Sequence, residues 1–292
     1  MAIGEIGLTS SMRSNLISLQ TTARLLGQTE ERLATGKRVN TAVDNPANFF
    51  AAQGATSRAG QLTGLKDGIS EAIQTVKAAD SGIKGVLTTI ETLRGVLTQA
   101  RSAINDTVNS GATLAGLTTQ YNGLIGQLNN LVTDSSYKGT NFLTSGSVTL
   151  TVNFNENATT KIVMSGFNSG ASGLGISGGG ASLTVAGTTG NITSAEIDSG
   201  TELDAVEAKL NAAIATLQTK ASELSANLST LTVRQTFISE MVNTLIVGAT
   251  KLTEADTNEE GANLLALQTK QQLGTTALSI SSQAEQSILR LF

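Results

Sequence analysis

The sequence contains no cysteine, no histidine and no tryptophan, and it has one proline among its 292 residues. Without cysteine the chain can form no disulfide, thiol nucleophile or iron–sulfur cluster. Without histidine it lacks the commonest catalytic base and any zinc motif of the H-E-x-x-H type. The glycine pairs and runs at 173–180 lack the strand–turn–helix context that phosphate-binding loops need. We therefore expect no catalytic, cofactor-binding or metal-binding site, and no enzyme.

Charged and aromatic residues are also scarce, at 14% and 3%, and the net charge is −4. A nucleic-acid-binding surface would need clustered Lys and Arg, which the sequence does not show. No run of about eighteen uncharged apolar residues is present, so membrane insertion is not expected. Residues 1–12 show no basic region followed by an apolar run, so no cleavable secretory signal is expected. Leu, Ile, Val and Ala must then form the core, as in a helical bundle.

An apolar stripe with heptad spacing extends through the last third of the chain. Steps of four and three residues connect Leu210, Ile214, Leu217, Ala221, Leu224, Leu228, Leu231, Gln235, Ile238, Val242, Leu245, Ala249 and Leu252. An ideal straight helix drifts away from this spacing, so the stripe predicts long helices wound round one another. Gln235, the one polar member, either specifies the register of the bundle or lies at a wet edge, and both interpretations remain open.

Two further helices with the same kind of stripe are predicted before residue 110. The first carries Met12, Leu16, Leu19, Ala23, Leu26, Glu30 and Leu33, and Gly36 suits its C-terminal end. Asp44-Asn45-Pro46 suits the start of the second, expected at about 48–108. Its stripe is Ile83, Val86, Ile90, Leu93, Leu97, Ala100 and Ile104. Its glycines, each costing about 1 kcal/mol relative to Ala, predict close backbone packing at Gly54, Gly60, Gly64, Gly68, Gly82, Gly85 and Gly95.

The middle of the chain changes period. A third helix is expected from Leu114 to Leu131, after a break at 109–111. Apolar residues then alternate with Ser and Thr, which predicts a β-hairpin at about 147–167 with its turn at 155–157. Residues 170–200 are rich in Gly, Ser and Thr and predict an exposed insertion, with one short strand at 182–186. The helical pattern restarts at 201–204.

The C-terminal segment is nearly uncharged. Residues 262–292 contain three charges, Lys270, Glu285 and Arg290, although their apolar residues have helical spacing. A solvent-exposed helix would carry more charge, so we expect this helix to be enclosed by other chains, the alternative being a coiled coil within one chain. The fold class predicted is mainly α, an elongated antiparallel helical bundle or coiled coil with a small β-hairpin region at the tip. Copies that stack through unlike surfaces would form an open helical filament.

Two sequence signatures resemble those of bacterial flagellin. Residues 31–40 (ERLATGKRVN) and 42–47 (AVDNPA) resemble the N-terminal signature of the family, and residues 271–279 (QQLGTTALS) with 289–292 resemble its closing helix. Residues 137–143 and 148–167 resemble its hairpin region. The resemblance implies a structural subunit that self-assembles into the flagellar filament for swimming motility. It also implies a terminal coiled-coil (inner-tube) domain, 1–40 with 255–292, and a helical-bundle (outer-tube) domain, 41–254, that carries the hairpin and the insertion.

The same resemblance implies the partners and the location. The chain would bind itself, sister flagellins, the flagellar junction and cap proteins, and a cytoplasmic export chaperone at its C-terminal helix. It would leave the cell through the type III channel of the flagellum and reside in the extracellular filament. Two alternatives share some of these features, a hook–filament junction protein and a secreted coiled-coil protein that binds another partner.

Three groups of residues follow from the stripes and the resemblance. The first should pack between subunits: Met12, Leu16, Leu19, Leu26, Leu33, Leu264, Leu267, Leu273, Leu278, Ile288 and Leu291. The second should line the bundle: Ile83, Ile90, Leu97, Leu210, Leu217, Leu224, Leu231, Ile238 and Leu245. The third, Ile90, Leu93, Arg94 and Gln99, aligns with the stretch that innate immune receptors recognise in some flagellins. Thr92 and Gly95 depart from that stretch, so weak receptor activation is expected.

Other polar and aromatic pairs have ordinary structural interpretations. The adjacent carboxylates Glu30-Glu31 and Glu259-Glu260 are expected to be solvated charges on exposed helix faces. Phe49-Phe50 is expected to pack where the second long helix begins. The terminal helices alone lack partners that would offset their ordering entropy, so they are expected to fold only as the filament assembles.

Overall fold

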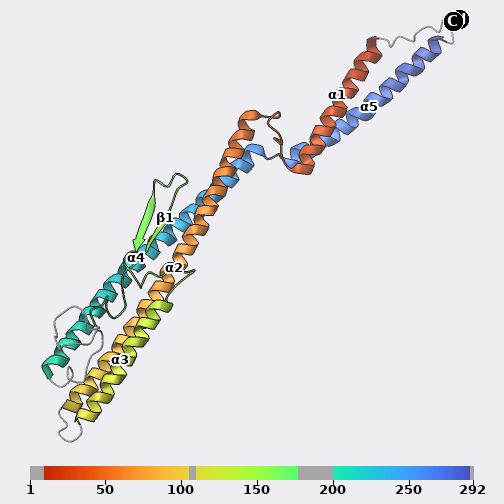
Figure 1. Cartoon of the computed structure of the whole chain (residues 1–292). Helices are drawn as coiled ribbons and strands as arrows, with labels where there is room; N and C mark the ends of the chain where they lie inside the picture. Colours follow the sequence, from red (N-terminus) through yellow and green to blue (C-terminus); the bar gives the residue numbers. More distant parts are fainter. Residues whose placement is uncertain (1–9, 105–109, 177–199, 290–292) are drawn as a thin grey trace. The chain divides into compact units, whose positions relative to one another are not determined.

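The computed structural model describes residues 10–104, 110–176 and 200–289. Figure 1 shows their elements in chain order: α1 (Ser10–Thr35), α2 (Pro46–Ile104), α3 (Ser110–Asp134), β1 (Thr149–Asn153), β2 (Lys161–Ser165), α4 (Gly200–Thr253) and α5 (Thr257–Leu289). The fold is therefore mainly α with a small antiparallel sheet, as the sequence predicts. None of the described helices could span a membrane. Most of the predicted insertion, including the strand at 182–186, lies outside the described residues.

Contacts divide the chain into two compact units. The first comprises residues 1–60 and 242–292, and the second comprises residues 61–241. The domain boundaries predicted from the sequence, 40/41 and 254/255, fall elsewhere, in the breaks that separate α1 from α2 and α4 from α5.

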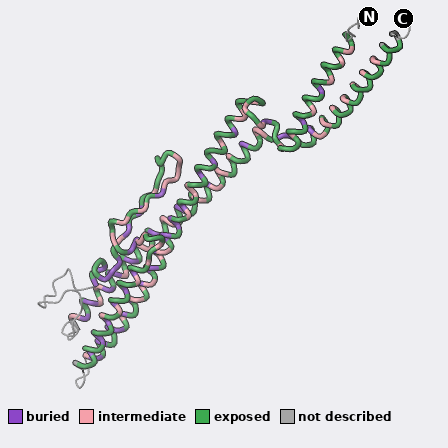
Figure 2. Tube along the Cα trace, turned by 45° about the vertical axis from the view of Figure 1, so that its right-hand side comes forward, coloured by how far each residue is buried: buried purple, intermediate pink, exposed green. Residues whose placement is uncertain are grey.

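The second unit has a continuous apolar core along its helices. Side chains of α2 with no exposed surface include Ile69, Val76, Ile83 and Ile90. Figure 2 shows the buried residues running along α2, α3 and α4. Every position of the stripe from Leu210 to Ile238, the part within this unit, is buried or half-buried, because a heptad stripe keeps one face of a long helix against its neighbour.

Several polar side chains belong to this interior. The side-chain amide of Gln235 on α4 donates a hydrogen bond of 2.7 Å to the Ser70 hydroxyl on α2. This pairing favours the register interpretation of Gln235, since a satisfied polar pair in an apolar seam disfavours a shifted alignment. Tyr121 of α3 is fully enclosed, and this burial raises the pKa of its phenol.

The β-hairpin is short and contacts α4 close to its turn. Its strands pair from Thr149 with Ser165 to Asn153 with Lys161, and Val152 and Met164 turn their side chains to the core. Close to its turn, the Arg234 guanidinium of α4 lies 5.1 Å from the centre of the Phe154 ring. The hairpin is thereby tied to α4.

The glycines of α2 fall into two groups, those packed against another segment and those facing open space. A Cβ on Gly82 would collide with Leu143 and Ser135, and one on Gly85 would come within 2.7 Å of Leu131. Close packing is thus found at these two positions. The prediction is wrong within this chain for the other five, because no atom lies within 4 Å of the Cβ position at Gly54, Gly60, Gly64, Gly68 and Gly95.

The contrast between enclosed and open glycines can be tested. In Gly166→Ala, the new Cβ would lie 2.7 Å from the carbonyl oxygens of Phe142 and Ser145, backbone atoms that cannot move aside easily. We expect the free energy of unfolding to fall by roughly 1–3 kcal/mol. In the control Gly64→Ala the space is open, and we expect a gain of up to about 1 kcal/mol. Denaturant unfolding measures both, and a G166A variant as stable as the parent would contradict the structure.

Candidate functional site

The helices α1 and α5 pack against each other in antiparallel fashion, and we call them the terminal pair. Two contacts set their alignment. Arg32, near the end of α1, binds Glu260, near the start of α5, at 3.0 Å. Leu19, farther back along α1, lies 3.1 Å from the Cβ position of Gly274, farther along α5.

The seam of the terminal pair contains at least as many polar as apolar residues. The positions that are buried or half-buried there step by three and four: Met12, Asn15, Leu19, Thr22, Leu26, Thr29 and Arg32 on α1, and Glu260, Leu264, Leu267, Gln271, Gly274, Leu278 and Ser281 on α5. Among the described residues of both helices, the buried side chains are those of Thr22, Thr29 and Glu260. The described part of the pair therefore encloses no buried apolar side chain.

Only part of the stripe predicted for α1 meets α5, and packing of the rest between subunits stays a prediction. Met12, Leu19 and Leu26 do lie in the seam, but Leu16 and Leu33 are each 38% exposed. Their places are taken by residues one position earlier, such as Thr22 instead of Ala23. The Thr22 hydroxyl donates to the Ser18 carbonyl at 2.9 Å, so the side chain can enter the seam with its polar group satisfied.

A second apolar stripe lies on the outer face of α5. Leu265, Leu273 and Ile280 are 66%, 66% and 62% exposed. At 100° per residue they fall within about 80° of one another, roughly opposite the seam residues Glu260 and Gly274. Sequence reasoning identified Leu273 but missed Leu265 and Ile280, because it followed a single stripe. Their spacing of eight and seven residues was the available signal.

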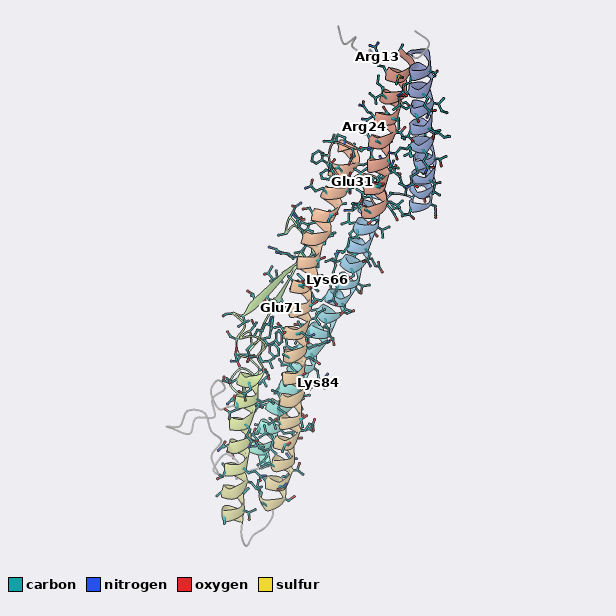
Figure 3. The ribbon with its side chains drawn as sticks, turned by 90° about the vertical axis from the view of Figure 1, so that its right-hand side faces the viewer. Arg13, Arg24, Glu31, Lys66, Glu71 and Lys84 are labelled. Carbon is teal, nitrogen blue, oxygen red and sulfur yellow. The ribbon has the colours of Figure 1, made fainter. Side chains whose placement is uncertain are left out.

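The other α5 residues that were predicted to pack between subunits can be placed only in part. Leu264, Leu267 and Leu278 are half-buried in the seam, and the side chains of Ile288 and Leu291 lie outside the described residues. The outer surface of α1 differs from that of α5 because it carries the exposed charges Arg13, Arg24 and Glu31 (Figure 3). Ile17, which is 63% exposed, lies among these charges, so both outer surfaces carry apolar side chains and that of α1 is charged as well.

The two breaks between helices bind each other at the base of the terminal pair. The backbone N–H groups of Arg38 and Val39 donate to the Thr253 carbonyl at 2.7 and 3.2 Å. The N–H of Ala255 donates to the Gly36 carbonyl at 3.0 Å. We call residues 36–39 and 253–255 the connector clasp. Because it ties the end of α1 to the start of α5, it fixes where the seam begins.

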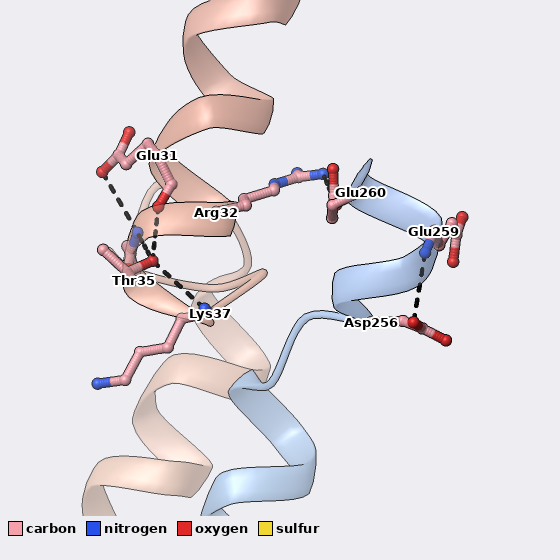
Figure 4. Close-up of polar contacts among 8 residues, drawn as sticks. Glu31, Arg32, Thr35, Lys37, Asp256, Glu259 and Glu260 are labelled. Atoms are coloured by element: carbon pink, nitrogen blue, oxygen red, sulfur yellow. Dashed lines mark hydrogen bonds and ion pairs between the residues drawn. The ribbon is translucent and has the colours of Figure 1, made fainter. Parts of the chain in front are cut away.

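Capping residues terminate the helices on either side of the clasp. Gly36 has a φ of +66°, a conformation that glycine adopts readily at a helix C-terminus. Asn45 caps α2 by accepting from the N–H of Asn48 at 3.1 Å, and Asp256 caps α5 in the same way (Figure 4). Asp44 accepts from the N–H groups of Thr41 and Asn40, and these hydrogen bonds hold the pKa of its carboxyl below the usual value.

The Arg32–Glu260 ion pair corrects one prediction. Glu260 is not a solvated charge, since its side chain is only 9% exposed and it accepts from the Arg32 guanidinium (Figure 4). Its neighbour Glu259 is exposed, as expected. The sequence offered no sign of this pair, because its members are separated by 228 residues.

Other predicted residues fall in ordinary positions. Phe49 is half-buried and stacks edge-on against Phe50, which is 60% exposed. In the receptor-like stretch, Ile90 and Leu93 have no exposed surface, whereas Gln99 is exposed. Arg94 lies 3.7 Å from Glu91. Weak receptor activation stays a prediction.

Two models of one protein family match most of the chain. Residues 7–149 match the family model described as the bacterial flagellin N-terminal helical region, and residues 203–292 match the bacterial flagellin C-terminal helical region. Both helices of the terminal pair lie entirely within these two matches.

Individual relatives are similar over the full length. "Flagellin FljO" of Caulobacter vibrioides is 27% identical over 292 residues, with 100% of both chains covered. A flagellin of Brucella melitensis is 29% identical over 291 residues and covers 97% of each chain. Among solved structures, the crystal structure of Bacillus cereus flagellin matches with a TM-score of 0.44 and 14% identity, covering 59% of this chain and 88% of that chain.

Proposed function

The chain belongs to the bacterial flagellin family and is a structural subunit of the flagellar filament, and from this premise we propose that the terminal pair is the surface through which subunits bind one another. The observation that carries the proposal is the distribution of burial. The terminal pair has no fully buried apolar side chain among its described residues, yet it exposes Leu265, Leu273 and Ile280 along one face. Burying such side chains gains about 25 cal/mol per Å², and neighbouring subunits would supply the cover.

We propose further that folding of the terminal pair is completed during assembly. Its seam relies on half-buried leucines, threonines and one ion pair, which give little gain against the conformational entropy of two long helices. Contacts with neighbouring subunits would add the missing burial.

The domain division follows from the same proposal. Residues 1–40 with 255–292 would form the inner tube, and residues 41–254 would form the outer tube. The connector clasp supports this division, because it joins the two helix breaks that separate these parts of the chain. Sister flagellins with matching terminal helices would enter the same filament.

The proposal extends to export. The outer face of α5 would need cover in the cytoplasm, and an export chaperone that binds this helix would provide it before passage through the type III channel. The junction and cap proteins of the flagellum would then meet the subunit at the two ends of the extracellular filament. The resemblance and the exposed apolar face of α5 support this sequence of partners.

A charge placed on the outer face of α5 tests the proposal. Leu273→Asp should leave the monomer as helical as the parent, because Leu273 is largely exposed. We expect it to raise the critical concentration for polymerisation at least tenfold, because a buried carboxylate without a partner is costly. Sedimentation of seeded filaments measures this effect.

The matched control is Gln268→Asp, which adds the same charge to α5 at an exposed position about 140° round the helix from Leu273 and about 60° from Leu265. It should polymerise like the parent. Normal polymerisation of L273D would show that this face is not an assembly surface.

A further inference from the structure

The outer face of α4 in the second unit carries an apolar projection. Val233 is 65% exposed and Phe237 is 50% exposed. They lie four residues apart, so they are neighbours on one helical face. Among the described aromatic residues only Phe50 and Phe237 are exposed, in a chain with nine aromatic residues in all. We call Val233 and Phe237 the knob.

A groove of about 500 Å³ lies elsewhere on the same unit, between α2 and β1. Gly64, Leu65, Gly68 and Ala72 form its α2 side, Leu150 and Val152 belong to its β1 side, and polar residues, Tyr137 and Asn153 among them, also line it. No atom lies within 4 Å of the Cβ positions of Gly64 and Gly68, so the groove floor is open backbone. Nothing within the described chain requires glycine there, although each costs about 1 kcal/mol of helix stability relative to alanine.

The knob and the groove face away from the contact between their two helices. Ser70 and Gln235 mark that contact. At 100° per residue, Gly64 and Gly68 lie about 120° and 160° round α2 from Ser70. Val233 and Phe237 each lie about 160° round α4 from Gln235. One subunit therefore offers both features outward, on different surfaces.

We propose that the knob of one subunit inserts into the groove of a second copy of this chain. The inference rests on the proposed function only in requiring that copies assemble, and it adds a contact outside the terminal pair. A knob and a groove on different surfaces make a head-to-tail contact, and such contacts continue without closing unless the rotation forms a ring.

The chemistry of the two surfaces suits a second copy. A water molecule takes about 30 Å³, so the groove holds many waters that an aromatic and an aliphatic side chain would release. The charges at the groove, Glu71 and Lys138, bind each other, so neither is left for a charged ligand. The open glycines let the backbone of α2 come close to an incoming ring.

The absence of native cysteine allows a direct test in the full-length protein. Filaments would be grown from a mixture of Val233→Cys and Gly68→Cys subunits and treated with a short bismaleimide. We expect a covalent dimer of the two variants, at least tenfold more abundant than in filaments of either variant alone. Thr232→Cys replaces V233C as the control, since residue 232 is exposed but points about 100° away from residue 233. Mixed filaments without the V233C–G68C product would overturn the proposal.

Two further variants separate this contact from the terminal pair. Phe237→Asp and Gly68→Leu should each fold like the parent, because both positions are exposed, and each should raise the critical concentration roughly tenfold. Gly123→Leu, at an open glycine of α3, is the matched control for the added volume and should assemble normally. Normal assembly of F237D and G68L, alongside failure of L273D, would refute the knob and groove while leaving the terminal pair intact. Normal assembly of L273D with failure of F237D and G68L would refute the terminal pair alone.

Discussion

Deletion of residues 282–292 is expected to leave a soluble, largely helical monomer that no longer polymerises. The second unit keeps its apolar core, because none of that core lies in the deleted segment. The intramolecular seam also keeps its contacts from Glu260 to Gly274. What the deletion removes is the end of the chain with its apolar residues Ile288, Leu291 and Phe292. If that end is covered only by neighbouring subunits, its loss removes interface area from every subunit at once.

Circular dichroism measures the helicity of the truncated monomer. Electron microscopy after seeding shows whether it polymerises. The expected result is near-parental helicity with no filaments at subunit concentrations where the parent polymerises fully. Deleting another stretch of equal length would interrupt a helix and is not a suitable control. The control is instead a full-length variant in which Ser282 and Ser287 become alanine. That variant should still polymerise. Filaments of normal length from the truncated chain would refute the proposed role of the C-terminal helix.

Arg32→Met is expected to open the base of the terminal pair. Glu260 would remain in a site that leaves its side chain 9% exposed, without the guanidinium that now binds it. Removing one member of a buried ion pair typically costs about 3–5 kcal/mol. Arg32 keeps 28% exposure, so we expect a smaller loss of about 2–3 kcal/mol in the local stability of the pair. Hydrogen exchange of the amides at the start of α5 in assembled filaments would report it.

Two controls test whether the expected effect of Arg32→Met comes from leaving a buried charge unpaired. Lys84→Met breaks the exposed Lys84–Asp80 pair on α2, where Lys84 is 73% exposed, and should change stability by less than about 1 kcal/mol. The double variant R32M/E260L removes both charges and should recover much of the loss, because no unpaired charge stays buried. If R32M exchanged as slowly as the parent, the ion pair would not be what holds the base of the pair.

Several features of the fold were predictable because they depend on local spacing. The heptad stripe of α4, the break at Gly36 and the start at Asn45-Pro46 all follow from residues within a few turns of one another. The hairpin was predictable for the same reason, since alternation of apolar and polar residues is a property of a single strand. These predictions agree with the described elements to within a few residues.

Features that depend on which helix meets which face were not predictable. On α1, the sequence predicted a stripe along the most apolar line of residues. The helix instead turns the residues one position earlier, such as Thr22 and Thr29, towards α5. The glycines of α2 looked alike in the sequence, but only Gly82 and Gly85 meet a neighbour closely. Glu260 looked like an exposed carboxylate until the antiparallel alignment placed Arg32 beside it.

The sequence by itself determined that the chain would be built from long helices with a hairpin, and it predicted that the terminal helices bind other chains. Helical period, capping and composition are local quantities, so a linear string of residues contains them. The tertiary structure alone decided that α1 and α5 form a partly polar seam, that α5 turns Leu265, Leu273 and Ile280 outward, and that a knob and a groove occupy different faces of the second unit. These outcomes depend on the rotation of each helix about its axis against a neighbour distant in sequence, and a heptad stripe limits that rotation only to within about one residue.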